Sequence, residues 1–131
     1  MIFVSTGGFS SERPIDTTKA MIKEGITDIE LSSGKEDGLN INDFIQLKSE
    51  CNFQVHNYFP PPKEPFVFNL ASLDPDVAKQ SFEHAKIAIQ WACELDNPTY
   101  SFHAGFLIDP KVSELGKRIK NRQVYNREES L

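Results

Sequence analysis

The sequence predicts an α/β fold in which parallel strands alternate with helices. Four short runs rich in β-branched and aromatic residues alternate with three segments that carry helix signals. The expected strands are 2–4, 26–31, 53–56 and 99–103. The expected helices are 15–24, 40–47 and 75–95. Strands joined by helices form right-handed crossovers in a parallel sheet. With 131 residues, the chain suits one domain, expected to span residues 1–131, and is too short for two.

Cap and turn residues set where these segments begin and end. Pro14 suits the first turn of a helix, and Asn40 can cap the second helix. Asp74 and Pro75 together open the third. Three prolines at 60–62 make the segment after the third strand irregular and extended. The resulting order of elements is β-α-β-α-β-α-β.

The third helix is the longest, and its apolar residues recur in steps of four and three. Residues at this spacing share one face of a helix, so we expect this stripe to pack on the sheet. The stripe consists of Ala78, Phe82, Ala85, Ile89 and Ala92. His84 lies one residue away from the stripe, and we expect it on a solvated or half-buried face.

The composition is that of a globular protein, and the charge and cysteine counts argue against several classes of protein. Fourteen Lys and Arg against nineteen Asp and Glu give a net charge of −5, which excludes a broadly basic nucleic-acid-binding surface. The basic run at 117–122 could contact a phosphate, but it is more simply a solvated face. Cys51 and Cys93 cannot build a disulfide framework and are expected to be buried free thiols. Without a signal peptide or a run of about 20 apolar residues, we expect a cytoplasmic protein with no membrane partner.

The end of the sequence predicts that this chain is part of a longer protein. Asn126 followed by Glu129 forms a variant of the capping box, which announces a helix at the last few residues. Four βα units are half of an eight-fold barrel of about 250 residues. We therefore expect a truncated half barrel. Its sheet would have two open edges and an uncovered apolar face, which invite self-association.

Polar residues cluster at the expected carboxyl ends of the strands, where ligands bind in parallel α/β folds. These residues are Thr6, Glu30, His56, Asn57 and His103. If the third and fourth strands are neighbours, the imidazoles of His56 and His103 lie on one rim and could bind one metal ion. The alternative is a pair of buried or hydrogen-bonded histidines with no ligand.

Other residues near these ends are candidates for contacting a substrate. Glu30 could hydrogen-bond a sugar hydroxyl or support a histidine, or it could be a solvated strand end. Tyr58 and Phe106 follow the third and fourth strands, and their side chains could line a pocket for a sugar or a nucleotide. Such aromatic residues also commonly cover the end of a core. Asn57, next to His56, is a further candidate for substrate binding.

Three short motifs resemble those of the xylose isomerase-like TIM barrel superfamily. They are Val55-His56-Asn57-Tyr58-Phe59, Phe68-Asn69-Leu70-Ala71-Ser72 and Ser101-Phe102-His103-Ala104-Gly105. They match, in order, the third strand, the loop that follows it and the fourth strand of that superfamily. The superfamily holds sugar phosphate isomerases and epimerases and the endonuclease IV enzymes. The resemblance is to the N-terminal half of the barrel only.

The resemblance implies a metal site in a full-length protein. In endonuclease IV-like members, the matching histidines bind zinc, so His56 and His103 are the implied ligands of a divalent ion, Zn²⁺, Mn²⁺ or Mg²⁺. The remaining ligands and the catalytic carboxylates of the superfamily come from strands five to eight, which this sequence lacks. Two histidines do not complete a Zn²⁺ site, which takes at least three protein ligands. For this chain alone we expect no bound metal, no activity and no catalytic residue.

Three functions follow as hypotheses. The first is the N-terminal part of a metal-dependent isomerase or epimerase acting on a small sugar or sugar phosphate, favoured by the acidic charge and the aromatic loops. The second is an endonuclease IV-like zinc phosphodiesterase acting on DNA, favoured by the two histidines and disfavoured by the net charge of −5. The third is a non-catalytic half barrel that associates with itself through its open sheet edges.

Overall fold

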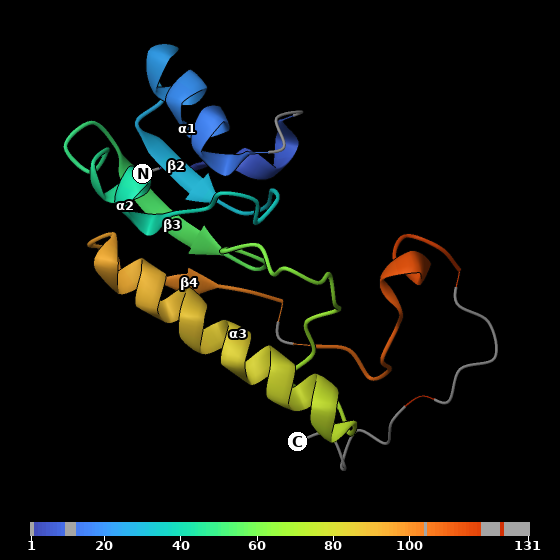
Figure 1. Ribbon diagram of the computed structural model, residues 1–131. Helices are drawn as coiled ribbons and strands as arrows, with labels where there is room; N and C mark the ends of the chain where they lie inside the picture. Colours follow the sequence, from blue (N-terminus) through green and yellow to red (C-terminus); the bar gives the residue numbers. More distant parts are fainter. Residues whose placement is uncertain (1, 10–12, 104, 119–123, 125–131) are drawn as a thin grey trace.

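A parallel sheet forms the centre of the computed structural model, which describes residues 2–9, 13–103, 105–118 and 124 (Figure 1). Its strands are β1 (Val4–Ser5), β2 (Asp28–Leu31), β3 (Asn52–His56) and β4 (Tyr100–Ser101). They lie side by side in the order β1-β2-β3-β4, and every neighbouring pair is parallel. The described part of the chain is therefore an α/β fold with a four-stranded parallel sheet, as the sequence predicted.

Helices connect the strands in the predicted order. They are α1 (Pro14–Lys23), α2 (Ile41–Ile45) and α3 (Pro75–Glu94), with short 3-10 turns η1 (Thr6–Gly8) and η2 (Val112–Glu114). The predicted caps are confirmed. Asn40 Oδ1 accepts the N–H of Asn42 at 3.0 Å, and Asp74 Oδ1 accepts that of Asp76 at 2.9 Å. β2 and β4 are shorter than expected, β3 begins one residue earlier than expected, and β1 lies at Val4–Ser5 in place of residues 2–4. β4 ends two residues before His103.

One face of the sheet packs on the helices. Alternate residues of β2 and β3 are fully buried against them: Ile29, Leu31, Phe53 and Val55. Phe44 of α2 lies at the centre of this core, and its ring meets those of Phe53, Phe59 and Trp91 edge to face at 5.7–5.9 Å between centroids. All three helices contribute side chains to this single core, so they cover the same face.

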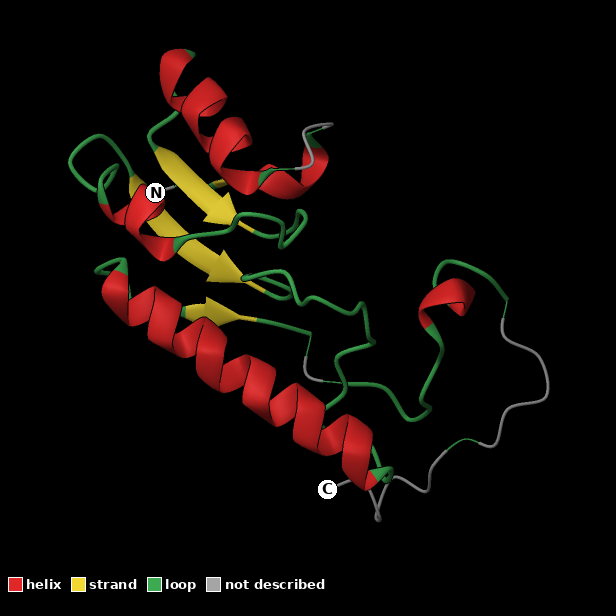
Figure 2. Cartoon of the chain, viewed as in Figure 1, coloured by secondary structure: helices red, strands yellow, loops and turns green. Residues whose placement is uncertain are grey.

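The opposite face of the sheet is polar, so the expectation of an uncovered apolar face is wrong. The residues between the buried ones project there: Asp28, Glu30, Asn52, Gln54 and His56. Asn52 Nδ2 donates to Asp28 Oδ1 across the two strands at 2.8 Å. Because side chains alternate along a strand, the sequence pattern that makes one face apolar makes the other one polar. No described helix packs on this face. Figure 2 shows the strand arrows pointing the same way, so their carboxyl ends share one edge.

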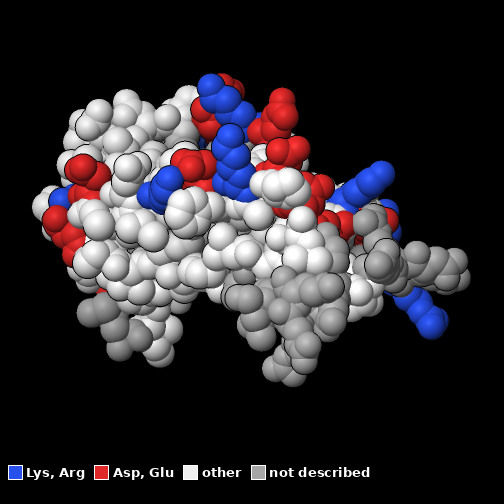
Figure 3. Space-filling model, turned by 90° about the horizontal axis from the view of Figure 1, so that it is seen from below, with Lys and Arg blue, Asp and Glu red and all other residues white. Residues whose placement is uncertain are grey.

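The predicted core stripe of α3 is wrong in part. The side chains buried on the sheet are those of Ser81, His84, Ala88 and Ala92. Phe82 is 56% exposed and Ile89 is 50% exposed. The three small buried residues let α3 lie close to the strands, and the larger apolar residues face sideways. Figure 3, seen from below, shows charged side chains along the upper border and at both ends of the molecule, with a broad uncharged area between them.

His84 is buried rather than solvated. Its side chain is enclosed by the rings of Tyr58, Phe66 and Phe68, with centroids 5.7–6.2 Å away. Its Nε2–H donates to the backbone carbonyl of Asn57 at 3.1 Å. Burial lowers the pKa of His84 below its usual value, and the hydrogen bond to Asn57 offsets part of this effect. The residue therefore ties α3 to the end of β3 in its neutral form.

The two cysteines differ, which corrects the expectation that both are buried. Cys51 is buried before β3, and burial, with a smaller effect of Glu50, raises the pKa of its thiol to about 11. Cys93 is exposed near the end of α3. Cys51 is thus protonated and unreactive at neutral pH, whereas Cys93 is accessible.

Asn69 connects the loop after β3 to the loop after β4 through hydrogen bonds. It is fully buried, and its Nδ2 lies 2.7 Å from Asp109 Oδ1 and 3.1 Å from the carbonyl of Phe106. Its Oδ1 accepts the N–H of Phe106 at 2.9 Å, and its own N–H donates to Ser81 Oγ of α3 at 2.9 Å. A Cβ at Gly105 would collide with Asn69 Oδ1, so the close approach of the two loops requires glycine there.

Some expectations fall on parts of the chain that the structure leaves undescribed. The capping box of Asn126 and Glu129 lies outside the described residues, as do positions 119–122 of the basic run. Lys117, at the start of that run, donates to the carbonyl of Ser113 at 2.9 Å. Among the described helices, none has the length and apolar character needed to cross a bilayer.

The substitution Asn69→Ala should lower the free energy of unfolding by about 2–3 kcal/mol, because it leaves buried backbone groups of both loops without partners. The matched control is Asn52→Ala, which removes one exposed amide hydrogen bond and should cost less than about 1 kcal/mol. Urea denaturation followed by circular dichroism measures both. Equal losses in the two variants would contradict the role given to Asn69.

Stability should decrease in acid partly because of His84. The unfolded side chain takes up a proton near pH 6.5, but the folded one does so only at lower pH. Below pH 6.5 the unfolded state therefore binds more protons, and the free energy of unfolding should fall by up to about 1.4 kcal/mol per pH unit. Above pH 6.5 the contribution is constant.

The variant His84→Gln keeps a hydrogen-bond donor but does not titrate, so it should lose this part of the pH dependence. Urea denaturation of both proteins between pH 5 and pH 8 gives the difference in slope, in which the carboxylates common to both cancel. Parallel curves would show that burial of His84 does not affect its protonation.

Candidate functional site

The carboxyl ends of β3 and β4 bring a histidine and a serine together. His56 is the last residue of β3 and Ser101 is the last residue of β4, and the two are paired in the parallel register. Both side chains project from the polar face of the sheet. His56 Nδ1 lies 2.9 Å from Ser101 Oγ, a hydrogen-bond distance.

Glu30 approaches the same nitrogen from β2. Its Oε2 is 3.8 Å from His56 Nδ1, and about a quarter of each side chain is exposed. The sequence suggested that Glu30 supports a histidine, and the structure places it within reach of His56. A carboxylate is negatively charged and has no proton to donate. At 3.8 Å it therefore favours the form of His56 that carries a proton on Nδ1.

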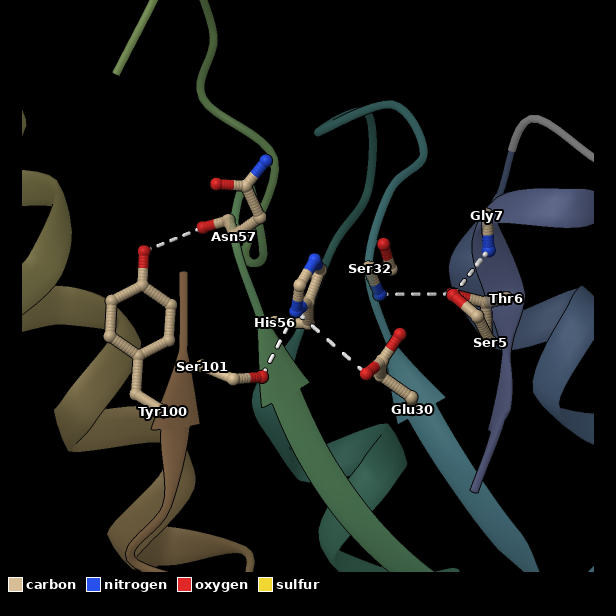
Figure 4. Close-up of polar contacts among 9 residues, drawn as sticks. All are labelled: Ser5, Thr6, Gly7, Glu30, Ser32, His56, Asn57, Tyr100 and Ser101. Atoms are coloured by element: carbon tan, nitrogen blue, oxygen red, sulfur yellow. Dashed lines mark hydrogen bonds and ion pairs between the residues drawn. The ribbon is translucent and has the colours of Figure 1, made fainter. Parts of the chain in front are cut away.

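Nδ1 is the ring nitrogen of His56 that Ser101 and Glu30 engage. When Nδ1 carries the proton, as the carboxylate of Glu30 favours, Nε2 carries the lone pair. Figure 4 shows Nδ1 facing Ser101 and Glu30, with the other ring nitrogen pointing away from both, beyond the ends of the strands. Neutral imidazole held in this way is the form that binds metal ions.

His103 lies beside His56, although it follows the end of β4. The two ring centroids are 5.8 Å apart and the rings are nearly perpendicular, at 83°. His103 is exposed. The expectation that both imidazoles lie on one rim therefore agrees with the geometry. Together with Glu30 they line the same edge of the polar face.

Asn57 fixes the backbone at the end of β3. It has a φ of 46°, a left-handed conformation that asparagine tolerates better than most residues. Its carbonyl accepts both His84 Nε2–H at 3.1 Å and the hydroxyl of Tyr100 at 2.7 Å, and its N–H donates to the carbonyl of Ser101 at 2.7 Å. The side-chain Oδ1 is buried and has no partner among the described residues. The backbone hydrogen bonds of Asn57 thus hold the end of β3 and with it the position of His56.

The hydroxyl groups of two tyrosines are held within the loops. Burial, with a smaller effect of Tyr58, raises the pKa of Tyr100 to about 12. The hydroxyl of Tyr58 accepts the N–H of Phe68 at 2.7 Å, and burial also raises the pKa of Tyr58. Both therefore stay protonated at neutral pH. Tyr58 lines an apolar cavity of about 240 Å³ with Phe66 and other loop residues.

Phe106, the other aromatic candidate, lies in the loop held by Asn69. Its side chain is 41% exposed, while its backbone N–H and carbonyl are both bonded to Asn69. Like Tyr58, it sits in a loop after a strand end, as expected, without a described contact to His56.

Thr6 joins the ends of β1 and β2. Its side chain is buried, and Oγ1 accepts the N–H of Ser32 at 3.1 Å (Figure 4). Gly7 follows in the turn η1, where its N–H meets Ser5 Oγ at 3.3 Å. Thr6 therefore has a structural contact that accounts for its position.

The described residues supply part of a metal site. Within the described ranges, no three His, Cys, Asp or Glu side chains are arranged to enclose an ion. His56 Nε2 and His103 offer two imidazole ligands, and Glu30 offers a carboxylate to orient one of them. A Zn²⁺ ion would need at least one further protein ligand.

Sequence reasoning missed Ser101 and Asn69. The sequence could have predicted that Ser101 belongs to the site. Ser101 and His103 are two residues apart, so in an extended segment their side chains lie on the same side. Asn69 was noticed only as part of a motif. Its role depends on Phe106 and Asp109, which lie 37 and 40 residues away in the sequence.

Comparison with known proteins gives a likeness of fold. No protein-family model and no curated protein matches this sequence. A solved structure, described as the TTHB071 protein from Thermus thermophilus soaked with ZnCl2, matches 86% of this chain with a TM-score of 0.54 and 18% identity. The match covers 42% of that protein, so this chain spans less than half of its length. At this identity the likeness supports the α/β fold alone.

The proton of His56 should reside on Nδ1 when the ring is neutral. Long-range ¹H–¹⁵N correlation spectra distinguish the two neutral tautomers by their nitrogen shifts. The variant Ser101→Ala combined with Glu30→Gln should move the population toward Nε2–H, since both interactions that hold the proton on Nδ1 are weakened. The spectrum of His84, bonded through Nε2–H, provides an internal reference. An Nε2–H tautomer at His56 in the unmodified protein would contradict this arrangement.

Proposed function

We propose that this chain is the N-terminal half of a (β/α)₈ barrel that acts as a metal-dependent isomerase or epimerase on a sugar or sugar phosphate. The proposal rests on one observation: His56 and His103 lie side by side at neighbouring strand ends, and Nδ1 of His56 is engaged by Ser101 and Glu30. The strand order and the helices on one face support a half barrel, and the polar side chains at the carboxyl ends of the strands would then lie at its mouth, where active sites of such barrels are found.

His56 and His103 could supply two of the ligands of a divalent metal ion. His56 would bind through Nε2, and His103 would supply a second imidazole from the next strand. A divalent ion at this rim would polarise the carbonyl and hydroxyl oxygens of a sugar. Glu30 and Ser101 would hold the imidazole of His56 in the ligating tautomer. The remaining ligands and the proton-transferring carboxylates would come from the part of the barrel that these residues do not form.

A small polar substrate suits the surroundings better than DNA. Glu30 places negative charge beside His56, and the whole chain carries −5. Phosphodiester backbones are bound by Lys and Arg, so these charges oppose a nuclease. Sugars instead hydrogen-bond to carboxylates and amides, which Glu30 and Gln54 provide on this face.

Titration with Zn²⁺, followed by NMR of the imidazole ring signals, tests the metal site. The ring signals of His56 and His103 should shift together as the ion is added, and those of the buried His84 should stay unchanged. The variant His56→Gln should abolish the response of His103, because a single imidazole holds Zn²⁺ weakly. Zn²⁺ is the first ion to test, since the structure with a similar fold was soaked with ZnCl2.

Independent responses of the two histidines, or no response, would contradict a shared site. The reaction itself is tested on the protein isolated from its natural source, whose intact mass gives its length. That protein should interconvert aldose and ketose sugars or their epimers with a divalent ion present, and His56→Gln should reduce the rate. DNA cleavage in place of isomerisation would favour the phosphodiesterase.

A further inference from the structure

A groove on the helix side of the sheet has a volume of about 420 Å³. Three segments form it: one side of α3, the prolines at 60–62 after β3, and the loop before α2 (Figure 1). From α3 it is lined by Gln80, Glu83, His84, Ile87 and Trp91. His56 projects from the opposite face of the sheet, so this groove is separate from the candidate site. Its volume is in the range of cavities that hold small organic ligands.

The walls of the groove are apolar and rigid. Pro60 and Pro61 are buried, and their rings fix the backbone on one side. On the other side Trp91 is held by Phe44 and Phe59, with ring centroids 5.8 and 5.3 Å away. Both of these phenylalanines are fully buried in the core. The wall is therefore formed before any ligand arrives, which lowers the cost of ordering it on binding.

Hydrogen-bond acceptors predominate among the polar groups of the groove. His84 uses its Nε2–H for the carbonyl of Asn57, so Nδ1 of the neutral ring can only accept. The carboxylates of Glu36 and Glu83 also only accept, and the amide of Gln80 can do either. These groups favour a ligand that supplies N–H or O–H donors.

The charge around the groove is negative on balance. Glu36 and Glu83 contribute two carboxylates, against the single ammonium of Lys63. Lys63 is 81% exposed and lies 3.9 Å from Glu36, and a pair so exposed contributes little. Glu83 is paired with Lys86, whose ammonium lies over the ring of Phe82, outside the groove lining. Both carboxylates are 42–55% exposed and remain open to a cation in the groove.

Two aromatic rings add to this chemistry. Trp91 and Phe66 both line the groove, and the faces of aromatic rings attract cations, those of tryptophan most strongly. Flat apolar groups also pack well on such rings.

We propose that this groove binds an organic ammonium ion that carries a flat apolar group, such as a primary amine attached to an aromatic ring. The carboxylates and the acceptor nitrogen of His84 receive the N–H groups of the amine. The apolar group lies against Trp91 and the prolines. The proposal does not depend on the proposed function, because the groove and the site around His56 lie on opposite faces of the sheet.

Fluorescence titration is the first test. Trp91 is the only tryptophan of the sequence, so its emission reports on this groove. The probe 2-phenylethylamine should give a saturable change with a dissociation constant of about 1 mM, as suits a ligand of this size. The neutral 2-phenylethanol should bind about threefold more weakly, and the anion 3-phenylpropionate more weakly still. Equal affinity for all three, or no saturable change with the amine, would overturn the proposal.

A pair of charge variants tests whether the amine is bound by this groove. Glu83→Gln should weaken binding of 2-phenylethylamine about threefold and leave that of 2-phenylethanol unchanged. The matched control is Glu94→Gln, which neutralises an exposed carboxylate of the same helix outside the groove lining and should leave both affinities unchanged. Equal losses in the two variants would refute a specific site, because they would show that the overall charge attracts the amine.

NMR of the imidazole ring signals locates the bound amine. The ring signals of His84 should shift as 2-phenylethylamine is added, since His84 lines the groove. Those of His56 and His103 should stay unchanged. Shifts at His56 and His103 without a shift at His84 would place the amine on the polar face of the sheet and would overturn the proposal.

Discussion

The burial of alternate residues of β2 and β3 under the helices is the constraint on which the rest of the structure depends. Ile29, Leu31, Phe53 and Val55 are almost completely excluded from water and meet Phe44 of α2. A slip of one residue in either strand would turn these side chains to the polar side, at a cost of about 2 kcal/mol for each large apolar group exposed. The register of the central pair is therefore fixed by the core.

The same register positions the candidate site. Because Val55 must face the helices, His56 must face the opposite side, where Ser101 is its paired neighbour and Glu30 its diagonal one. Hydrogen bonds to the carbonyl of Asn57 then hold the strand end against α3 through His84 and against β4 through Tyr100. The orientation of the imidazole thus depends on buried groups that lie away from its ring.

The helix α3 has two distinct sides, and they serve different purposes. Small residues pack on the sheet and keep the helix close to it, while Phe82 and Ile89 remain on the flank. Apolar periodicity detects the more hydrophobic stripe, which here is the one beside β4. The contact with the sheet is made instead by Ser81, His84 and two alanines, whose hydrophobic signal is weak. Phe82 and Ile89 are therefore half exposed beside the edge of the described sheet.

The sequence by itself determined the order of elements, the parallel sheet, the caps at Asn40 and Asp74, and the strand ends at which His56 and His103 meet. These follow from local preferences and from the two-residue alternation of strands, which short stretches of sequence contain. Only the tertiary structure decided which side of α3 is buried, that His84 belongs to the core, and that Asn69 joins two loops. Each of these depends on contacts between residues far apart in the chain, such as Asn69 with Asp109 and His84 with Asn57. Such contacts form only when the whole core packs, so no local pattern encodes them.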